Sequence, residues 1–215
     1  MTAGRKALSD TKHWCTPPNI VGSVKRVFGG EIDLDPCSNE HSLVGARVNF
    51  LLPDHDGLVE RWDYKYIYVN PPYGSDPARG TRIAHWFAKI ASAVERGSQV
   101  IALVPVATNT GHWKNHVYPI ATAVCFLYQP RVRFYIEGRE DPKGAPMSCA
   151  VIYYGDDYER FAEEFCEHGA VIPLEHAVSA DHAGTRHGRG AAHSAGSSGS
   201  PRARTYGASG TGMSG

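Results

Sequence analysis

The sequence predicts an α/β fold, with a mostly parallel sheet and helices on both of its faces. Two observations indicate this class: strand-like segments alternate with amphipathic helical segments along the chain, and the segment 99–104 is apolar at both alternating sets of positions. A strand that is apolar on both faces is typical of a sheet covered by helices on both sides.

The first half of the chain predicts one helix and three short strands. Thr16 is suited to cap the helix and Pro17 to open it, because the missing N–H of proline would have no partner there. Gly29-Gly30 ends this helix. Its apolar face is formed by Ile20, Val21, Val24, Val27 and Phe28. Strands are expected over residues 31–35, 48–51 and 65–69, with irregular chain over the rest of 38–63.

The second half predicts a more regular alternation. An amphipathic helix is expected over residues 83–94, a short helix over 109–117, and a last helix that Asp156 caps and Gly169 ends. The expected strands lie at residues 99–104, 123–127, 132–135, 149–154 and 171–172.

The composition indicates one domain with a tail. The chain has 215 residues, of which 42% are hydrophobic, so it can form a substantial core. We expect a flexible N-terminus over residues 1–13, a folded domain over 14–176, and a disordered tail rich in Gly, Ser, Ala and Arg over 177–215. The tail has a net charge of +3 and the remainder −3. The tail is either inert or an electrostatic tether for phosphate.

Several classes of protein are disfavoured by the sequence. No apolar run is long enough to span a bilayer, and the first residues lack the apolar stretch of a secretory signal. The five cysteines form no Cys-x-x-Cys pair, so neither a zinc site nor a disulfide framework is indicated. We therefore expect a cytoplasmic protein without a metal or a membrane partner.

The segment Asn70-Pro71-Pro72-Tyr73 is the motif with chemical content, and it directly follows the strand 65–69. In open α/β sheets, ligands bind at the carboxyl ends of strands. The two prolines fix the backbone and remove two N–H donors, Asn70 adds a side-chain acceptor, and Tyr73 offers a flat ring. This combination is suited to binding a planar amino or amide group. A proline-rich turn without a function is the alternative.

The motif resembles that of amino methyltransferases, and further motifs resemble the small phage-type DNA N6-adenine methyltransferases in particular. The resemblance covers roughly residues 14–155 and includes Trp14-Cys15-Thr16-Pro17-Pro18, Asp33-Leu34-Asp35-Pro36-Cys37-Ser38, Asp56-Gly57-Leu58, Trp62, Asn70-Pro71-Pro72-Tyr73-Gly74, Trp86, Leu103-Val104-Pro105, Thr108, Thr110, Trp113, Arg131-Val132-Arg133-Phe134 and Gly144-Ala145-Pro146. It implies a Rossmann-like methyltransferase fold, S-adenosylmethionine as cofactor, and DNA as substrate.

The resemblance also implies roles for the residues of the motif. Asn70 and the Pro71 carbonyl would accept hydrogen bonds from the adenine amino group, Pro72 would hold the turn, and Tyr73 would stack on the base. The adenine would be flipped out of the duplex or taken from a single strand, because a stacked base is out of reach.

The implied cofactor residues come from three segments. Thr16 and Pro17 would close the methionine end, and either Asp33 or Asp35 would face its positive charge. Pro36 and Cys37 would continue the first cofactor loop, where glycines of the wider class are replaced by Ser38-Asn39-Glu40. Asp56, beside Leu58, would bind the cofactor adenine, although an Asp-Gly turn is the alternative.

The implied substrate residues, besides Tyr73, are Thr108, Trp113, Arg131 and Arg133. Trp113 would border the base pocket or pack in the core, and the two arginines would contact phosphate or form a solvated strand face. The predicted function is DNA adenine-N6 methylation by a site-specific enzyme. The alternatives are methylation of RNA or of protein glutamine, and a non-catalytic nucleic-acid-binding module with a degenerate site.

Overall fold

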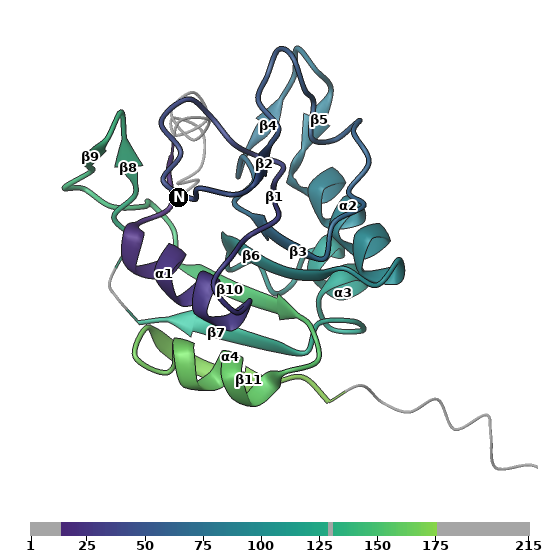
Figure 1. Cartoon of the computed structure of the whole chain (residues 1–215), viewed down its shortest axis with the longest axis vertical. Helices are drawn as coiled ribbons and strands as arrows, with labels where there is room; N and C mark the ends of the chain where they lie inside the picture. The colour runs from purple at the N-terminus through teal and green to yellow at the C-terminus, as the bar shows by residue number, and fades with distance from the viewer. Residues whose placement is uncertain (1–13, 129–130, 176–215) are drawn as a thin grey trace, which may run out of the picture. The chain divides into compact units, whose positions relative to one another are not determined.

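The computed structural model describes residues 14–128 and 131–175, which form a mixed α/β structure around a seven-stranded sheet (Figure 1). The strand order is β11-β7-β10-β6-β3-β1-β2, and two small two-stranded sheets, β4-β5 and β8-β9, lie outside it. The predicted segments 1–13 and 177–215 lie outside the described residues.

The bounds of the elements in chain order are α1 (Pro18–Val27), β1 (Leu34–Asp35), β2 (Val48–Asn49), β3 (Tyr66–Val69), β4 (Ser75–Asp76), β5 (Thr81–Arg82), α2 (Ile83–Glu95), β6 (Gln99–Pro105), α3 (Gly111–His116), β7 (Ala123–Leu127), β8 (Tyr135–Ile136), β9 (Arg139–Glu140), β10 (Cys149–Tyr154), α4 (Tyr158–Phe165) and β11 (Gly169–Pro173).

The predicted α/β class, with a mostly parallel sheet and helices on both faces, is confirmed. Strands β2, β1, β3 and β6 are parallel neighbours, and β7 runs in the same direction because it is separated from β6 by the antiparallel β10. Strand β11 is antiparallel to β7, so five of the seven strands point one way. The carboxyl ends of β1, β3 and β7 therefore lie at the same edge of the sheet.

Both faces of the sheet are buried, as the apolar segment 99–104 predicts. In β6, Ile101 and Leu103 belong to the cluster covered by α1 and α4, whereas Val100, Ala102 and Val104 belong to the cluster covered by α2 and α3. All five side chains are fully buried. Successive strand residues point to opposite faces, so one strand contributes to two cores.

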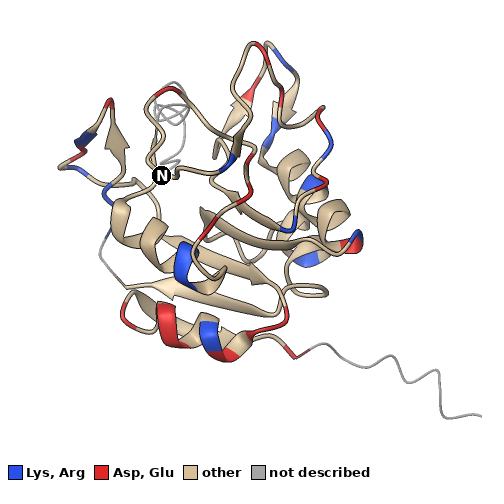
Figure 2. Cartoon of the chain, viewed as in Figure 1, with Lys and Arg blue, Asp and Glu red and all other residues tan. Residues whose placement is uncertain are grey.

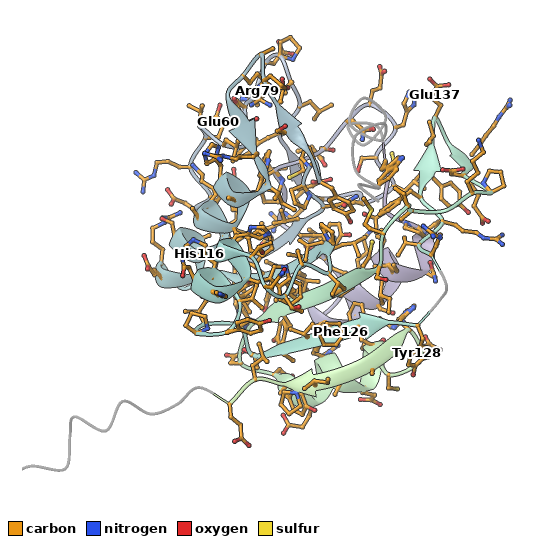
Figure 3. All side chains as sticks on the ribbon, turned by 180° about the vertical axis from the view of Figure 1, so that it is seen from behind. Glu60, Arg79, His116, Phe126, Tyr128 and Glu137 are labelled. Atoms are coloured by element: carbon orange, nitrogen blue, oxygen red, sulfur yellow. The ribbon has the colours of Figure 1, made fainter. Side chains whose placement is uncertain are left out.

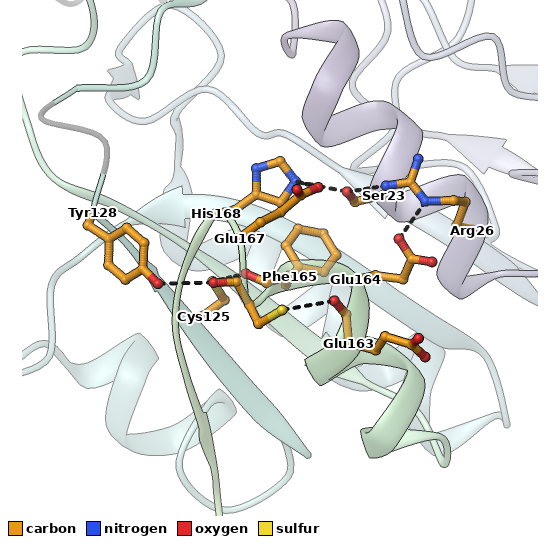
Figure 4. A network of polar contacts seen from close by, with 10 residues as sticks. Ser23, Arg26, Cys125, Tyr128, Glu163, Glu164, Phe165, Glu167 and His168 are labelled. Atoms are coloured by element: carbon orange, nitrogen blue, oxygen red, sulfur yellow. Dashed lines mark hydrogen bonds and ion pairs between the residues drawn. The ribbon is translucent and has the colours of Figure 1, made fainter.

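A polar network joins the two helices on one of these faces. Ser23 of α1 is fully buried, and its hydroxyl lies 2.8 Å from Nε2 of His168, just after α4 (Figure 4). Arg26 donates to the Ser23 hydroxyl and forms an ion pair with Glu164 of α4. Burial lowers the pKa of His168, so the neutral imidazole is favoured.

Three predicted elements differ in detail. Of the predicted strand 132–135, only Tyr135 lies in a strand, as the first residue of β8; the turn of the β8–β9 hairpin is formed by Glu137 and Gly138, both with positive φ. Positive φ at both central residues is typical of the two-residue turn whose twist matches that of the two flanking strands. The cap of α4 is Asp157 rather than Asp156, because Asp157 accepts from the backbone N–H of Arg160. The predicted strand 31–35 shortens to Leu34–Asp35.

The predicted cap of α1 is also different. The helix begins at Pro18 after Pro17, with no side-chain cap bond. The Thr16 hydroxyl is buried and lies 2.8 Å from the hydroxyl of Tyr68 on β3. Because the Thr16 hydroxyl is hydrogen-bonded to Tyr68, it does not cap the N-terminus of α1.

Candidate active site

The predicted motif and the predicted cofactor loop lie next to each other at the carboxyl edge of the sheet. Strands β1 and β3 are parallel neighbours in register Leu34 to Ile67, so the turn after Asp35 and the turn after Val69 lie side by side. A cavity of about 450 Å³ opens beside them. We call it the carboxyl-edge pocket; it is lined in part by Pro36, Cys37, Phe50, Asp56, Pro72, Gly74, Arg79 and Trp86.

The Asn-Pro-Pro-Tyr turn, residues 70–73, begins with an oriented amide. Nδ2 of Asn70 donates to the backbone carbonyl of Trp14 at 3.0 Å. Among the described residues, none donates to Oδ1 of Asn70. Pro71 is buried, and Pro72 lines the pocket. The turn therefore holds one side-chain acceptor beside backbone that has no N–H groups at two successive positions.

Tyr73 points into the protein rather than standing free. Its hydroxyl donates to the carbonyl of Leu103 at 3.3 Å, and its ring packs edge-on against Trp14 and Phe134, with both centroid distances 6.0 Å. Burial raises the pKa of Tyr73 well above its usual value. The ring is thus fixed in an aromatic cluster, and its stacking on a base stays a prediction.

Asp35 is the most buried carboxyl group near the pocket, with only 3% of its surface exposed. Its two oxygens accept from the backbone N–H of Cys37 at 3.1 Å and from the hydroxyl of Ser42 at 3.2 Å. Burial outweighs these bonds and raises the pKa of Asp35 to about 6. The neighbouring Cys37 is half-buried, and desolvation raises the pKa of its thiol well above the usual value, so the neutral thiol is favoured.

Asp33 has different surroundings from Asp35. Its carboxylate accepts from the backbone N–H of Tyr66 at 3.0 Å and lies 3.5 Å from the guanidinium of Arg47. These contacts fasten the start of β3, and Asp33 does not line the carboxyl-edge pocket. Of the two predicted acids, Asp35 is therefore the one beside the pocket-lining Pro36 and Cys37.

Asp56 lines the pocket, but its carboxylate already has partners. One oxygen accepts from the backbone N–H of Leu58 at 2.9 Å, and the other forms an ion pair with Arg79. Burial raises the pKa of Asp56, but the bonds from Arg79 and Leu58 outweigh it, so the net pKa is lowered. The next residue is Gly57, where a Cβ would lie 2.0 Å from the Pro36 carbonyl, so only glycine fits.

The predicted substrate residues are spread more widely. Thr108 is exposed, and its carbonyl accepts from Tyr118. Trp113 is fully buried between α3 and the sheet, where it stacks on Phe126, so in this structure it packs in the core and offers no surface to a base. The predicted role of Trp113 in base binding gains no support from this position.

Arg131 and Arg133 are both exposed, whereas the intervening Val132 and the following Phe134 are buried, as their alternation predicts. Arg131 donates to the carbonyl of Ala145 at 2.8 Å, and Arg133 pairs with Glu140 of β9 at 2.9 Å. Their guanidinium groups thus brace the hairpin, and a phosphate contact stays a prediction.

Two hairpins flank this edge of the sheet. The β4–β5 hairpin follows β3 and carries Arg79, and the β8–β9 hairpin follows β7 and has Glu137 at its turn (Figure 3). Both hairpins contain arginine, Arg79 and Arg82 on β4–β5 and Arg139 on β8–β9 (Figure 2).

Sequence reasoning assigned no role to Trp14 or Arg79, although both contact predicted site residues. Trp14 lies 56 positions before Asn70, and Arg79 lies 23 positions after Asp56. Both separations are far longer than the few residues over which a helix or strand pattern relates side chains, so no local pattern could identify these partners. The resemblance includes Trp14, which was the available signal.

Residues 14–128 and 131–175 contain no group of three or more His, Cys, Asp or Glu side chains arranged to hold a metal ion. Within the same ranges, no helix combines the length and apolar character needed to cross a membrane.

Comparison with known proteins identifies the family. The family model for DNA N-6-adenine-methyltransferase (Dam) matches residues 4–171. The DNA N-6-adenine-methyltransferase of Haemophilus phage HP1 is 27% identical over 135 residues, which are 62% of this chain and 72% of that protein. No solved structure shows a significant match. Because the family model spans most of the sequence, the chain belongs to the Dam family of DNA N-6-adenine-methyltransferases.

Proposed function

We propose that this chain transfers a methyl group from S-adenosylmethionine to the exocyclic N6 of an adenine in DNA, at the Asn-Pro-Pro-Tyr turn. The observation that carries the proposal is the oriented amide of Asn70, two residues before Pro72, which lines the carboxyl-edge pocket. Family membership supplies the reaction class, and the position of the Asn-Pro-Pro-Tyr turn at the carboxyl edge of the sheet supports the proposed location.

The pocket suits the proposed methyl donor in size and chemistry. Its volume of about 450 Å³ falls in the range of small-molecule sites. Phe50 and Trp86 provide apolar walls for a nucleoside, and Asp56 provides a carboxylate. When bound, S-adenosylmethionine supplies an electrophilic methyl group on a positively charged sulfur. Pro36, Cys37 and Asp56 would hold it there.

The protein contributes to the proposed reaction by positioning the adenine amino group. Asn70 Oδ1 and the Pro71 carbonyl accept the two N–H bonds of the adenine amino group, which directs the nitrogen lone pair toward the methyl carbon. With the donor bound, the N–C bond would form as the C–S bond breaks, with S-adenosylhomocysteine as the leaving group, and the nitrogen would lose one proton to solvent. No neighbouring base is required, because the methylated amino group is acidic until that proton leaves.

The target adenine must leave the base stack to reach the turn. Asn70 is half-buried and Pro71 is buried, so a base paired inside a duplex cannot approach them. We propose that the adenine is extruded, and that the hairpins β4–β5 and β8–β9 contact the flanking DNA. A fluorescent 2-aminopurine in place of the target adenine should brighten on binding, and an unchanged signal in a duplex that the protein binds, when the matching adenine duplex is methylated efficiently, would contradict extrusion.

The substrate class is tested directly by product analysis. The protein is incubated with isotope-labelled S-adenosylmethionine and, separately, with mixed-sequence DNA, RNA of the same sequence, and glutamine-containing peptides. We expect label in DNA only, with N6-methyladenine as the product by mass spectrometry. Asn70→Ala should retain the fold and lower the single-turnover rate about a hundredfold or more, because it removes one acceptor for the reacting amino group. Label in RNA or in glutamine, without N6-methyladenine in DNA, would overturn the proposal.

A further inference from the structure

The segment of Trp14, Cys15 and Thr16 is fastened across the end of β3 by backbone and side-chain contacts. The Trp14 carbonyl accepts from Asn70 at 3.0 Å. Cys15 forms a β-bridge with Tyr135, with backbone bonds of 2.8 and 3.0 Å. The Thr16 hydroxyl lies 2.8 Å from that of Tyr68. This segment therefore joins three separate elements: the Asn-Pro-Pro-Tyr turn, the β8–β9 hairpin and the centre of the sheet.

The Trp14 carbonyl determines which end of the Asn70 amide faces the reacting group. An asparagine side chain has one accepting and one donating end, and rotation by 180° about its last bond exchanges them. With the carbonyl of Trp14 on one side, the donating Nδ2 is held there and the accepting Oδ1 points away. In the rotated form, Oδ1 of Asn70 would face the carbonyl oxygen of Trp14, and the two oxygens would repel. Nδ2 would then point toward the adenine amino group, which needs an acceptor and not a second donor.

The position of this carbonyl depends in turn on the indole ring of Trp14. The ring is stacked on Phe134, with centroids 4.9 Å apart and planes 9° from parallel, and it meets Tyr73 edge-on. Only 9% of the surface of Trp14 is exposed. Phe134 precedes Tyr135, the partner of Cys15 in the β-bridge, so the ring and the backbone of this segment are held by the same part of the chain.

We propose that Trp14 is a positioning residue for methyl transfer, which acts through Asn70 by selecting the accepting orientation of its amide. This inference rests on the proposed function. The start of the β8–β9 hairpin contributes to this positioning, because Phe134, just before β8, stacks on Trp14 and Tyr135 forms the β-bridge with Cys15. Trp14 itself has no contact with the reacting atoms in this account.

The test compares three substitutions by single-turnover methylation of DNA. Trp14→Ala removes the stacked ring and should lower the rate roughly 10- to 100-fold, because small misplacements of reacting groups have effects of this size. Donor affinity should be nearly unchanged. Trp14→Phe retains a stacking ring and should recover most of the rate. If Trp14→Ala does not fold, Trp14→Leu, which keeps apolar volume but no aromatic face, takes its place.

Phe28→Ala is the matched control for lost packing. Phe28 is 4% exposed, belongs to the same core cluster, and stacks on Tyr66 at 5.0 Å, away from the turn. It should lower thermal stability as Trp14→Ala does but leave the methylation rate of the folded protein near wild type. An equal loss of rate in both variants would show that Trp14 acts only through stability, and would overturn the inference.

A double-mutant cycle separates this inference from the proposed function. If Trp14 acts through Asn70, adding Trp14→Ala to Asn70→Ala should change the rate by no more than about twofold. Independent, multiplicative losses would overturn the role of Trp14 and leave the proposed function standing. A wild-type rate for Asn70→Ala alone would instead overturn the proposed function, and this inference with it.

Discussion

Asp35 is expected to lower the stability of the protein as pH rises from about 4 to about 6, and Asp35→Asn should remove this effect. Burial raises the pKa of Asp35 from 3.8 to about 6. The unfolded chain therefore loses this proton near pH 4, whereas the folded protein keeps it to about pH 6. Between these values the folded state binds more protons, so the free energy of unfolding falls as pH rises. The total loss from this group is about 3 kcal/mol.

Asparagine fits the site without a new unpaired group. Its Oδ1 can accept from the N–H of Cys37, and its Nδ2 can donate to the Ser42 hydroxyl, which rotates to accept. In urea unfolding, the variant should match wild type near pH 4 and exceed it by about 3 kcal/mol at pH 7.5. Asp54→Asn, an exposed carboxylate on the rim of the same pocket, is the control and should follow wild type throughout. A difference between Asp35→Asn and wild type that does not grow with pH would refute the reasoning.

The remaining predictions concern the turn, the pocket wall and the helix pair. Asn70→Asp keeps an acceptor but places a carboxylate oxygen against the Trp14 carbonyl, so its single-turnover rate should lie between those of Asn70→Ala and wild type. Arg79→Met should raise the pKa of Asp56 in NMR titration, weaken donor binding up to about tenfold in calorimetry, and cost under about 1 kcal/mol of stability, because the pair is partly exposed. His168→Asn should reduce the loss of stability that wild type shows as pH falls below 6.5, because only the unfolded chain protonates this ring readily there; an unchanged pH profile would contradict it.

The helices and the central strands were predictable from the sequence because their signals are local. Residues 99–104 and 149–154 read as strands and are strands, and the apolar faces of α1, α2 and α4 are the buried faces. The order of the strands in the sheet was not predictable. β10 lies between β6 and β7 and runs antiparallel to both, although both precede it in the chain. Strand insertion depends on tertiary pairing, which hydrophobic periodicity does not encode.

The location of the site was predictable to a similar extent. A polar turn after a buried strand indicates the carboxyl edge of an α/β sheet, and Asn70 and Asp35 both lie there. Their partners were not predictable. Arg79 binds the Asp56 carboxylate from a hairpin that has no periodic pattern, and the ring of Tyr73 meets Trp14 edge-on, a contact that no local pattern indicates. The residue types indicated what kind of ligand the site could bind. Which of these side chains already contact other protein groups depends on the tertiary structure.

The contacts that prepare the Asn-Pro-Pro-Tyr turn come from outside the strand that carries it. Proline at two successive positions stiffens the backbone of the turn but cannot orient the side chain of Asn70, which has its own rotatable bonds. That orientation is supplied by the carbonyl of Trp14, and Trp14 is held by Phe134 from the other half of the chain. A turn with the same four residues but without these neighbours would keep its backbone and lose its fixed acceptor. The Asn-Pro-Pro-Tyr motif is therefore only part of the site, and an account of this enzyme's rate must include the residues that hold its amide in one orientation.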